Sequence, residues 1–102
     1  MDEQLIRSLE KINTLARALH GSDAEADAHT FKSLAAHVDE VKELLAQEDP
    51  HWKAETLDII IHAMTLLRGH GVDTAEFEDL KQRRLARFQE KAKVEVLDES
   101  YK

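Results

Sequence analysis

The sequence predicts an all-α protein, and three observations lead to this prediction. Apolar residues recur every three or four positions along most of the chain, as they do on one face of a helix. Only one Pro and three Gly occur in 102 residues, so few residues interrupt a helix. Where the periodic pattern stops, Gly or Pro stands beside residues that commonly cap helices. We therefore expect four helices with short connections.

Two helices are expected in the first half of the chain. The first covers about residues 2–20 and ends at Gly21, because glycine readily adopts the left-handed conformation that follows a helix. The second begins after Ser22, which forms a capping-box pattern with Glu25. Its apolar pattern weakens over residues 28–30, which leaves room for a break there.

Two more helices are expected in the second half. Asp49-Pro50 has the residue types of an N-cap and a first helical position, so the third helix begins there. Gly69 marks its end, and Asp73 or Thr74 caps the fourth helix.

The chain is expected to form a single helical domain over residues 1–93. Residues 94–102 alternate weakly in polarity and are expected to form a tail, either a short strand or disordered. A lone domain of this size buries only about 60 to 70% of the surface that its unfolded chain exposes. Association with further copies would therefore help to complete the core.

Composition excludes several classes of function. The formal net charge of −7 disfavours binding to a nucleic-acid backbone. No cysteine is present, which removes disulfides, thiolate zinc sites and cysteine nucleophiles. The N-terminus does not resemble a signal peptide, and the uncharged run over residues 59–67 is far shorter than the ~20 residues of a membrane span. We expect a soluble, cytoplasmic protein that binds neither nucleic acid nor a membrane.

Two acidic pairs, Glu40-x-x-Glu43 and Glu55-x-x-Asp58, are the most informative motifs. Each pair has i,i+3 spacing, so its two carboxylates lie on one side of a helix. The second pair opens a strongly apolar run, where an unpartnered carboxylate is costly. If the four carboxylates lie close together, a hard divalent cation with oxygen ligands would offset their charge. The simpler alternative is that the acidic pairs lie on solvated helix surface.

The third helix carries one narrow polar arc. At about 100° per residue, Glu55, Asp58, His62 and Thr65 share this arc, and most of the remaining surface is apolar. Such a helix is expected to be central or to lie at a subunit interface. His62 is either an outer neighbour of a metal site or an interior histidine. None of the six histidines forms the close helical pair of a zinc protease motif.

A basic stripe is expected on the fourth helix. Arg84, Arg87 and Lys91 fall within an arc of about 60°, on an otherwise acidic protein. Guanidinium groups suit bidentate contacts with phosphate. The alternative is a solvated face whose charges pair with neighbours one turn away.

The string Asp39-Glu40-x-x-Glu43, followed by Glu55-x-x-Asp58, resembles the acidic signature of the all-α nucleoside triphosphate pyrophosphohydrolases, the MazG-like superfamily. This superfamily includes phosphoribosyl-ATP pyrophosphohydrolase and dimeric dUTPases. The resemblance covers about residues 30–91. The order and spacing of the acidic pairs and the apolar helix around the second pair carry it.

This resemblance implies a four-helix MazG-like assembly that acts as a homodimer or homotetramer. It implies that Glu40, Glu43, Glu55 and Asp58 are catalytic and bind Mg²⁺, or Mn²⁺ in its place. The activity implied is cleavage of the α–β phosphoanhydride of a nucleotide, giving a nucleoside monophosphate and pyrophosphate. Arg84, Arg87 and Lys91 are the candidate substrate-binding residues because they form the basic stripe, which would compensate for the phosphate-binding residue of the family.

The sequence departs from the family pattern in three respects. Asp39 stands where members often have Glu, and the phosphate-binding Asn or Lys of the last helix has no clear counterpart. The longer consensus of phosphoribosyl-ATP enzymes is absent as well. These departures leave the nucleotide open, and two alternatives remain: a non-catalytic binding or regulatory module that retains the fold, and a purely structural helical oligomer.

Overall fold

The computed structural model describes the backbone of residues 2–100 and the side chains of residues 2–94. All regular structure in this part of the chain is helical, which confirms the all-α prediction. The four helices are α1 (Glu3–His20), α2 (Asp23–Ala46), α3 (Trp52–Gly69) and α4 (Thr74–Ser100). Contacts divide the chain into two units, one containing α1 to α3 (residues 2–71) and one containing α4.

Local side-chain chemistry sets three of the helix starts, and those at Ser22 and Asp73 were expected from the sequence. In each case a side-chain oxygen accepts a hydrogen bond from the backbone N–H three residues later, which satisfies a donor that the first helical turn leaves free. The acceptors are Asp2 for α1, Ser22 for α2 and Asp73 for α4, at 2.7, 3.2 and 2.8 Å. After α1, Gly21 has a φ of +87° and donates its N–H to the carbonyl of Arg17.

Three helix boundaries differ from the sequence prediction. α2 continues without a break through residues 28–30, since no Gly or Pro interrupts its backbone hydrogen bonds there. α3 begins at Trp52, with His51 as N-cap, because Pro50 and His51 form a turn in which Asp49 accepts a bond from the N–H of His51. The expected N-cap Asp49 therefore stabilises the turn before the helix.

The third difference concerns the end of the chain. α4 runs to Ser100, through most of the segment expected to be a strand or a disordered tail. Neither Gly nor Pro occurs after Gly71, and Ala, Lys, Glu and Leu favour helix, so nothing in the covalent chain stops propagation. Residues 101–102 lie outside the described part.

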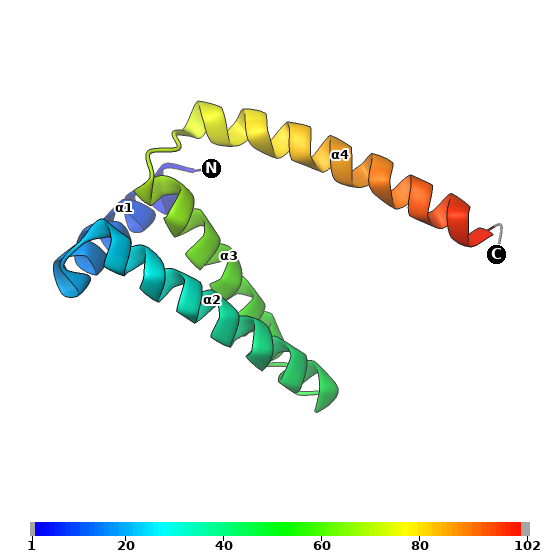
Figure 1. The fold of residues 1–102 in the computed structure, drawn as a ribbon, viewed down its shortest axis with the longest axis horizontal. Helices are drawn as coiled ribbons and strands as arrows, with labels where there is room; N and C mark the ends of the chain where they lie inside the picture. The colour runs from blue at the N-terminus through cyan, green and yellow to red at the C-terminus, as the bar shows by residue number, and fades with distance from the viewer. Residues whose placement is uncertain (1, 101–102) are drawn as a thin grey trace. The chain divides into compact units, whose positions relative to one another are not determined.

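In the α1–α3 unit, α2 and α3 form an antiparallel hairpin and α1 packs against both helices (Figure 1). Leu9 and Thr65 are its buried residues, with 1% and 6% of their surface exposed. Many large apolar side chains of this unit remain exposed in a single chain. They are Ile12, Leu15, Leu19, Phe31, Val38, Leu45, Leu57, Ile60 and Leu67.

α3 contacts both other helices of the unit, as its apolar character predicted. Thr65, from its polar arc, is buried and donates its hydroxyl to the carbonyl of Ile61. None of the helices over the described residues combines the length and the apolar character needed to cross a membrane.

Candidate metal centre

α2 and α3 lie side by side as a hairpin (Figure 1). Two side-chain contacts show that the helices run antiparallel. Asp27, near the start of α2, contacts His70 just after α3, and His37, further along α2, contacts Glu55 near the start of α3. The first acidic pair lies on α2 just after His37, and the second begins at Glu55 on α3. The turn between the helices therefore places the pairs on neighbouring segments.

Glu55 is the centre of the cluster. Nδ1 of His37 lies 2.5 Å from its Oε2 atom, and Nε2 of His51 lies 3.5 Å from its Oε1 atom. The side chains of His37 and Glu55 are 22% and 13% exposed, so most of this contact is shielded from water. Each carboxylate oxygen of Glu55 thus faces an imidazole, one from α2 and one from the turn before α3.

Asp58 joins this pair one turn further along α3. One ligand atom from each of His37, Glu55 and Asp58 lies within 4.8 Å of the others. Asp58 is half-buried, and the groups that the structure places near it are the imidazoles of His37 and His62. The structure gives no ion pair between Asp58 and a described Arg or Lys.

Glu40 approaches the cluster from α2 and has an altered protonation equilibrium. Its pKa is raised above the ordinary value, mainly through a hydrogen bond with Glu55 and also through repulsion between the two carboxylates. The pKa of Glu55 is lowered instead, first by its hydrogen bond with His37 and then by the one with Glu40. The opposite shifts reflect the closeness of the two carboxylates and the position of His37 beside Glu55.

His62 lies beside the cluster without being part of its donor set. Its ring centre is 5.1 Å from that of His37. Its pKa is lowered, because burial disfavours the charged imidazolium and because the charge of His37 repels it. The sequence left two alternatives for His62, an outer neighbour of a metal site or an interior histidine. Its position beside His37 fits the first alternative.

Glu43 lies at the edge of the site. Its side chain is exposed and accepts a 3.4 Å hydrogen bond from Gln47 on the same helix. Its charge is the weakest of the influences that raise the pKa of Glu40. The structure thus brings Glu55 and Asp58 together with His37, and it places Glu40 beside Glu55. Glu43 is one helical turn away from Glu40 and is exposed.

Sequence reasoning missed His37. A zinc motif on one helix needs two histidines about one turn apart. His37 does not form such a pair, because the other histidine of α2 is His29, eight positions away. The available signal was the spacing between His37 and Glu40, which is i,i+3 and continues the line of the first acidic pair by one turn.

The donor set of this cluster suits a divalent cation. Carboxylate oxygens and a neutral imidazole nitrogen are common metal ligands, and ligands at i,i+3 on facing helices recur in metal-binding bundles. The fit is chemical: two carboxylates and one imidazole already lie close enough for small side-chain rotations to bring them around one ion.

The basic stripe of α4 has no ion-pair partner among the side chains that the structure describes. Among the described residues, no ion pair forms with Arg84, Arg87 or Lys91, whereas Arg83 pairs with Asp79 at 2.7 Å. Phe88 lies among them, with the guanidinium of Arg84 5.5 Å from its ring centre. Together these four side chains line a shallow pocket. The expected alternative, a stripe neutralised one turn away, does not hold for the described neighbours.

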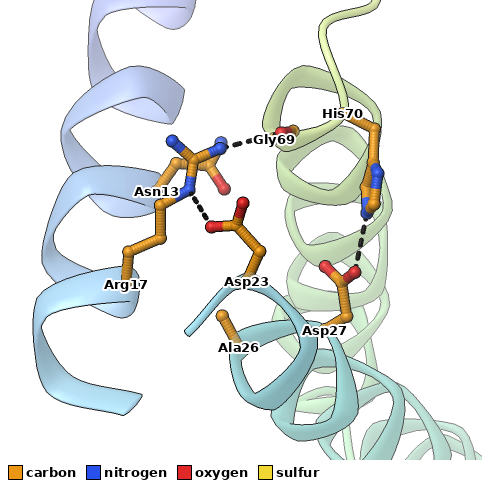
Figure 2. A pocket seen from close by; sticks show the side chains of 7 residues that line it. All are labelled: Asn13, Arg17, Asp23, Ala26, Asp27, Gly69 and His70. Carbon is orange, nitrogen blue, oxygen red and sulfur yellow. Dashed lines mark hydrogen bonds and ion pairs between the residues drawn. The ribbon is translucent and has the colours of Figure 1, made fainter. Parts of the chain in front are cut away.

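A second polar cluster lies where α1, the start of α2 and the end of α3 meet (Figure 2). Arg17 donates to the carbonyl of Gly69 at 2.8 Å and pairs with Asp23 at 2.9 Å. His70 faces Asp27 at 2.7 Å. Because these groups satisfy one another, we interpret the cluster as a structural link between the three helices.

Comparison with protein-family models, with curated proteins and with solved structures gave no match.

Proposed function

We propose that this chain is a metal-dependent nucleoside triphosphate pyrophosphohydrolase of the MazG-like type. The observation that carries the proposal is the closeness of Glu55 and Asp58 on α3 to His37 on α2, with Glu40 of α2 beside Glu55. Carboxylates converge in this way at sites that hold a cation for phosphate chemistry. The resemblance of the acidic pairs to the family signature supplies the reaction.

In this proposal the carboxylates of Glu55 and Asp58 hold the cation, and those of Glu40 and Glu43 complete its surroundings. A cation held by these residues would polarise the α-phosphate and lower the pKa of an attacking water. Glu40 has a raised pKa and lies beside Glu55, so its carboxyl is suited to accept a proton from that water. No side-chain nucleophile is needed.

The unpaired cations of α4 supply the phosphate contacts in this proposal. Arg84, Arg87 and Lys91 offer charge-assisted hydrogen bonds to phosphate. Phe88 adds an aromatic face for the nucleotide base. We also propose a cytoplasmic location for the protein.

We also propose that the active form is a homodimer or homotetramer. Large apolar side chains along α1 to α3 are exposed in a single chain, and contiguous apolar patches usually mark interfaces. Light scattering at micromolar concentration is expected to give a mass at least twice the 11.6 kDa of the chain. A mass near that of one chain would contradict the proposal.

The activity test measures pyrophosphate release from a panel of nucleoside triphosphates, with Mg²⁺ or Mn²⁺ and with a chelator. The Asp58→Asn variant is expected to lose activity by two or more orders of magnitude while it stays folded, since the shape is kept and only the charge is lost. Asp79→Asn is the matched control, because Asp79 forms an exposed pair with Arg83 on α4. Its activity should stay within about twofold of wild type.

Two results would overturn the proposal. The first is hydrolysis in the wild type that survives Asp58→Asn unchanged. The second is absence of hydrolysis across the panel with metal bound, which would leave the alternative of a non-catalytic binding module. Arg87→Gln, compared with Arg83→Gln, tests the stripe: KM should rise only for the unpaired Arg87.

A further inference from the structure

The most closely grouped metal donors in the described part of the chain are one nitrogen and two oxygens. They belong to His37, Glu55 and Asp58, and their ligand atoms lie within 4.8 Å of one another. The family signature names four carboxylates and no histidine. The donor set in this chain therefore differs from the set that the resemblance implies.

We propose that the centre takes a first-row transition-metal dication, with Nδ1 of His37 as a ligand beside the carboxylates of Glu55 and Asp58. This inference rests on the proposed function for the existence of a metal centre, and it adds the class of metal. Mg²⁺ prefers oxygen ligands and keeps its waters, whereas imidazole suits Zn²⁺, Fe²⁺, Co²⁺ and Ni²⁺. Mn²⁺ accepts carboxylates together with a histidine.

The geometry favours His37 as a ligand. Metal–nitrogen and metal–oxygen bonds of about 2.0 to 2.2 Å place two ligand atoms of one ion about 3 to 4 Å apart. The three donor atoms, all within 4.8 Å, therefore need only small rotations to surround one ion. Nδ1 of His37 and Oε2 of Glu55 now share a hydrogen bond at 2.5 Å. A metal between them would replace the proton of that bond.

The exposure of the side chains points the same way. Glu40 and Glu43 are exposed, so water can solvate their carboxylates without a metal. His37 and Glu55, at 22% and 13% exposure, are largely removed from water and held against each other across two helices. His51 further orients Glu55 from its second oxygen, as outer neighbours commonly orient a metal ligand.

A rival explanation makes His37 a positively charged partner of Glu55 that competes with the metal. The two explanations predict opposite effects of His37→Gln. If His37 is a ligand, the affinity for Mn²⁺ and Co²⁺ falls by at least tenfold. If His37 is a competing cation, its removal leaves divalent affinity unchanged or increases it.

The experiment measures Mg²⁺, Mn²⁺ and Co²⁺ binding to the full chain by calorimetry. Pulsed electron paramagnetic resonance of bound Mn²⁺ then reports whether a ¹⁴N nucleus is coordinated. We compare wild type with His37→Gln and with His37→Asp. The second variant replaces the nitrogen ligand by an oxygen ligand. His29→Gln is the control, because His29 is exposed on the same helix and stacks on His20. Thermal melts confirm that each variant is folded.

The expected result is that wild type binds Mn²⁺ and Co²⁺ at least tenfold more tightly than Mg²⁺ and shows a ¹⁴N coupling. The coupling should disappear in both His37 variants and persist in His29→Gln, and His37→Asp should lose the preference over Mg²⁺. Equal Mg²⁺ and Mn²⁺ affinity without a nitrogen signal would overturn the inference and leave the proposed metal centre in place. A coupling that persists in His37→Gln would assign the nitrogen to another histidine and also overturn it. Absence of all divalent binding would remove the centre itself.

Discussion

Nδ1 of His37 lies 2.5 Å from Oε2 of Glu55, in a contact that joins α2 to α3 at the candidate metal centre. Glu40 approaches the same carboxylate from α2, so one imidazole and two carboxylates compete for a small volume. Without a metal, the imidazole offsets only part of the negative charge. The site is therefore expected to limit the stability of the metal-free protein.

The first prediction concerns this repulsion and its dependence on pH. The pKa of Glu40 is higher in the folded chain than its ordinary value of 4.5, so the folded state binds this proton more tightly than the unfolded state does. Ionised Glu40 therefore destabilises the fold, and its effect grows as pH rises from about 4.5 through the raised pKa. At pH 7, with a chelator present, Glu40→Gln should melt above wild type.

The control for this prediction is Glu43→Gln, which removes the same charge one turn away, where its influence on Glu40 is the weakest. Its melting temperature should change much less. The gain in Glu40→Gln should vanish below pH 4, where Glu40 is protonated in both states. A gain of equal size at pH 3.5 and pH 7 would show that repulsion is not its cause.

Local chemistry made much of the fold predictable, and tertiary geometry accounts for what was missed. Caps at Ser22 and Asp73 depend on residues three positions apart, so the sequence shows them directly. The contact between His37 and Glu55 joins two helices, and no pattern within one helix reveals it. The links from α1 to α3 span 52 positions and are equally invisible to local analysis.

The candidate site was predictable to the same degree. The acidic pairs at i,i+3 spacing identified the helix faces that meet, because a helix period converts spacing into direction. Which carboxylate lies at the centre depends on how the hairpin closes, and this makes Glu55 central and Glu43 peripheral. The extent of α4 was predicted wrongly from local sequence. The weak alternation over residues 94–102 suggested a tail, but no Gly or Pro stops the helix there, and it continues to Ser100.

The second prediction concerns the contact between Gly69 and Asn13. A Cβ atom added at Gly69 would lie 2.8 Å from Oδ1 of Asn13, whose Nδ2 donates to the carbonyl of Thr65 at 3.1 Å. Gly69→Ala should therefore displace the Asn13 amide and lose that hydrogen bond, at a cost of roughly 1 kcal/mol. The gain in helix propensity from Ala offsets part of this cost.

A double-mutant cycle isolates this contact. In an Asn13→Ala background the clash is absent, so Gly69→Ala should be neutral or stabilising. Urea unfolding of the four proteins should give a coupling free energy of about 1 kcal/mol or more between the two sites. Additive effects of the two substitutions would contradict the predicted clash.

The third prediction concerns two residues in the left-handed region of φ. Glu48 has a φ of +58° in the turn after α2, and Gly21 has a φ of +87° after α1. A side chain with a Cβ atom is strained there by about 1 to 2 kcal/mol. Glu48→Gly should therefore raise the free energy of unfolding by roughly 1 kcal/mol, and Gly21→Ala should lower it by a similar amount.

Steric contact does not complicate this pair. A Cβ atom at Gly21 would approach only Oε2 of Glu25, at an ordinary 3.6 Å, so backbone conformation dominates the effect. Chemical denaturation of both variants measures the two changes in one experiment. Destabilisation by Glu48→Gly would mean that the turn after α2 does not hold a left-handed residue at this position in solution.

The last prediction compares two leucines of α1 to find which apolar surface stabilises a single chain and which stabilises the assembly. Leu9 is 1% exposed in the single chain, and Leu15 is 59% exposed. Leu9→Ala should cost about 2 to 5 kcal/mol at any protein concentration, because it leaves a cavity inside the α1–α3 unit. Leu15→Ala should cost less than about 0.5 kcal/mol if the surface around it stays in water.

If copies associate through the surface around Leu15, the melting temperature of wild type should rise with protein concentration. Leu15→Ala should then reduce this rise, whereas Leu9→Ala should preserve it. Melting curves over a hundredfold range of concentration distinguish these cases. A melting temperature independent of concentration in wild type would contradict the proposed homo-oligomer without affecting the expected cost at Leu9.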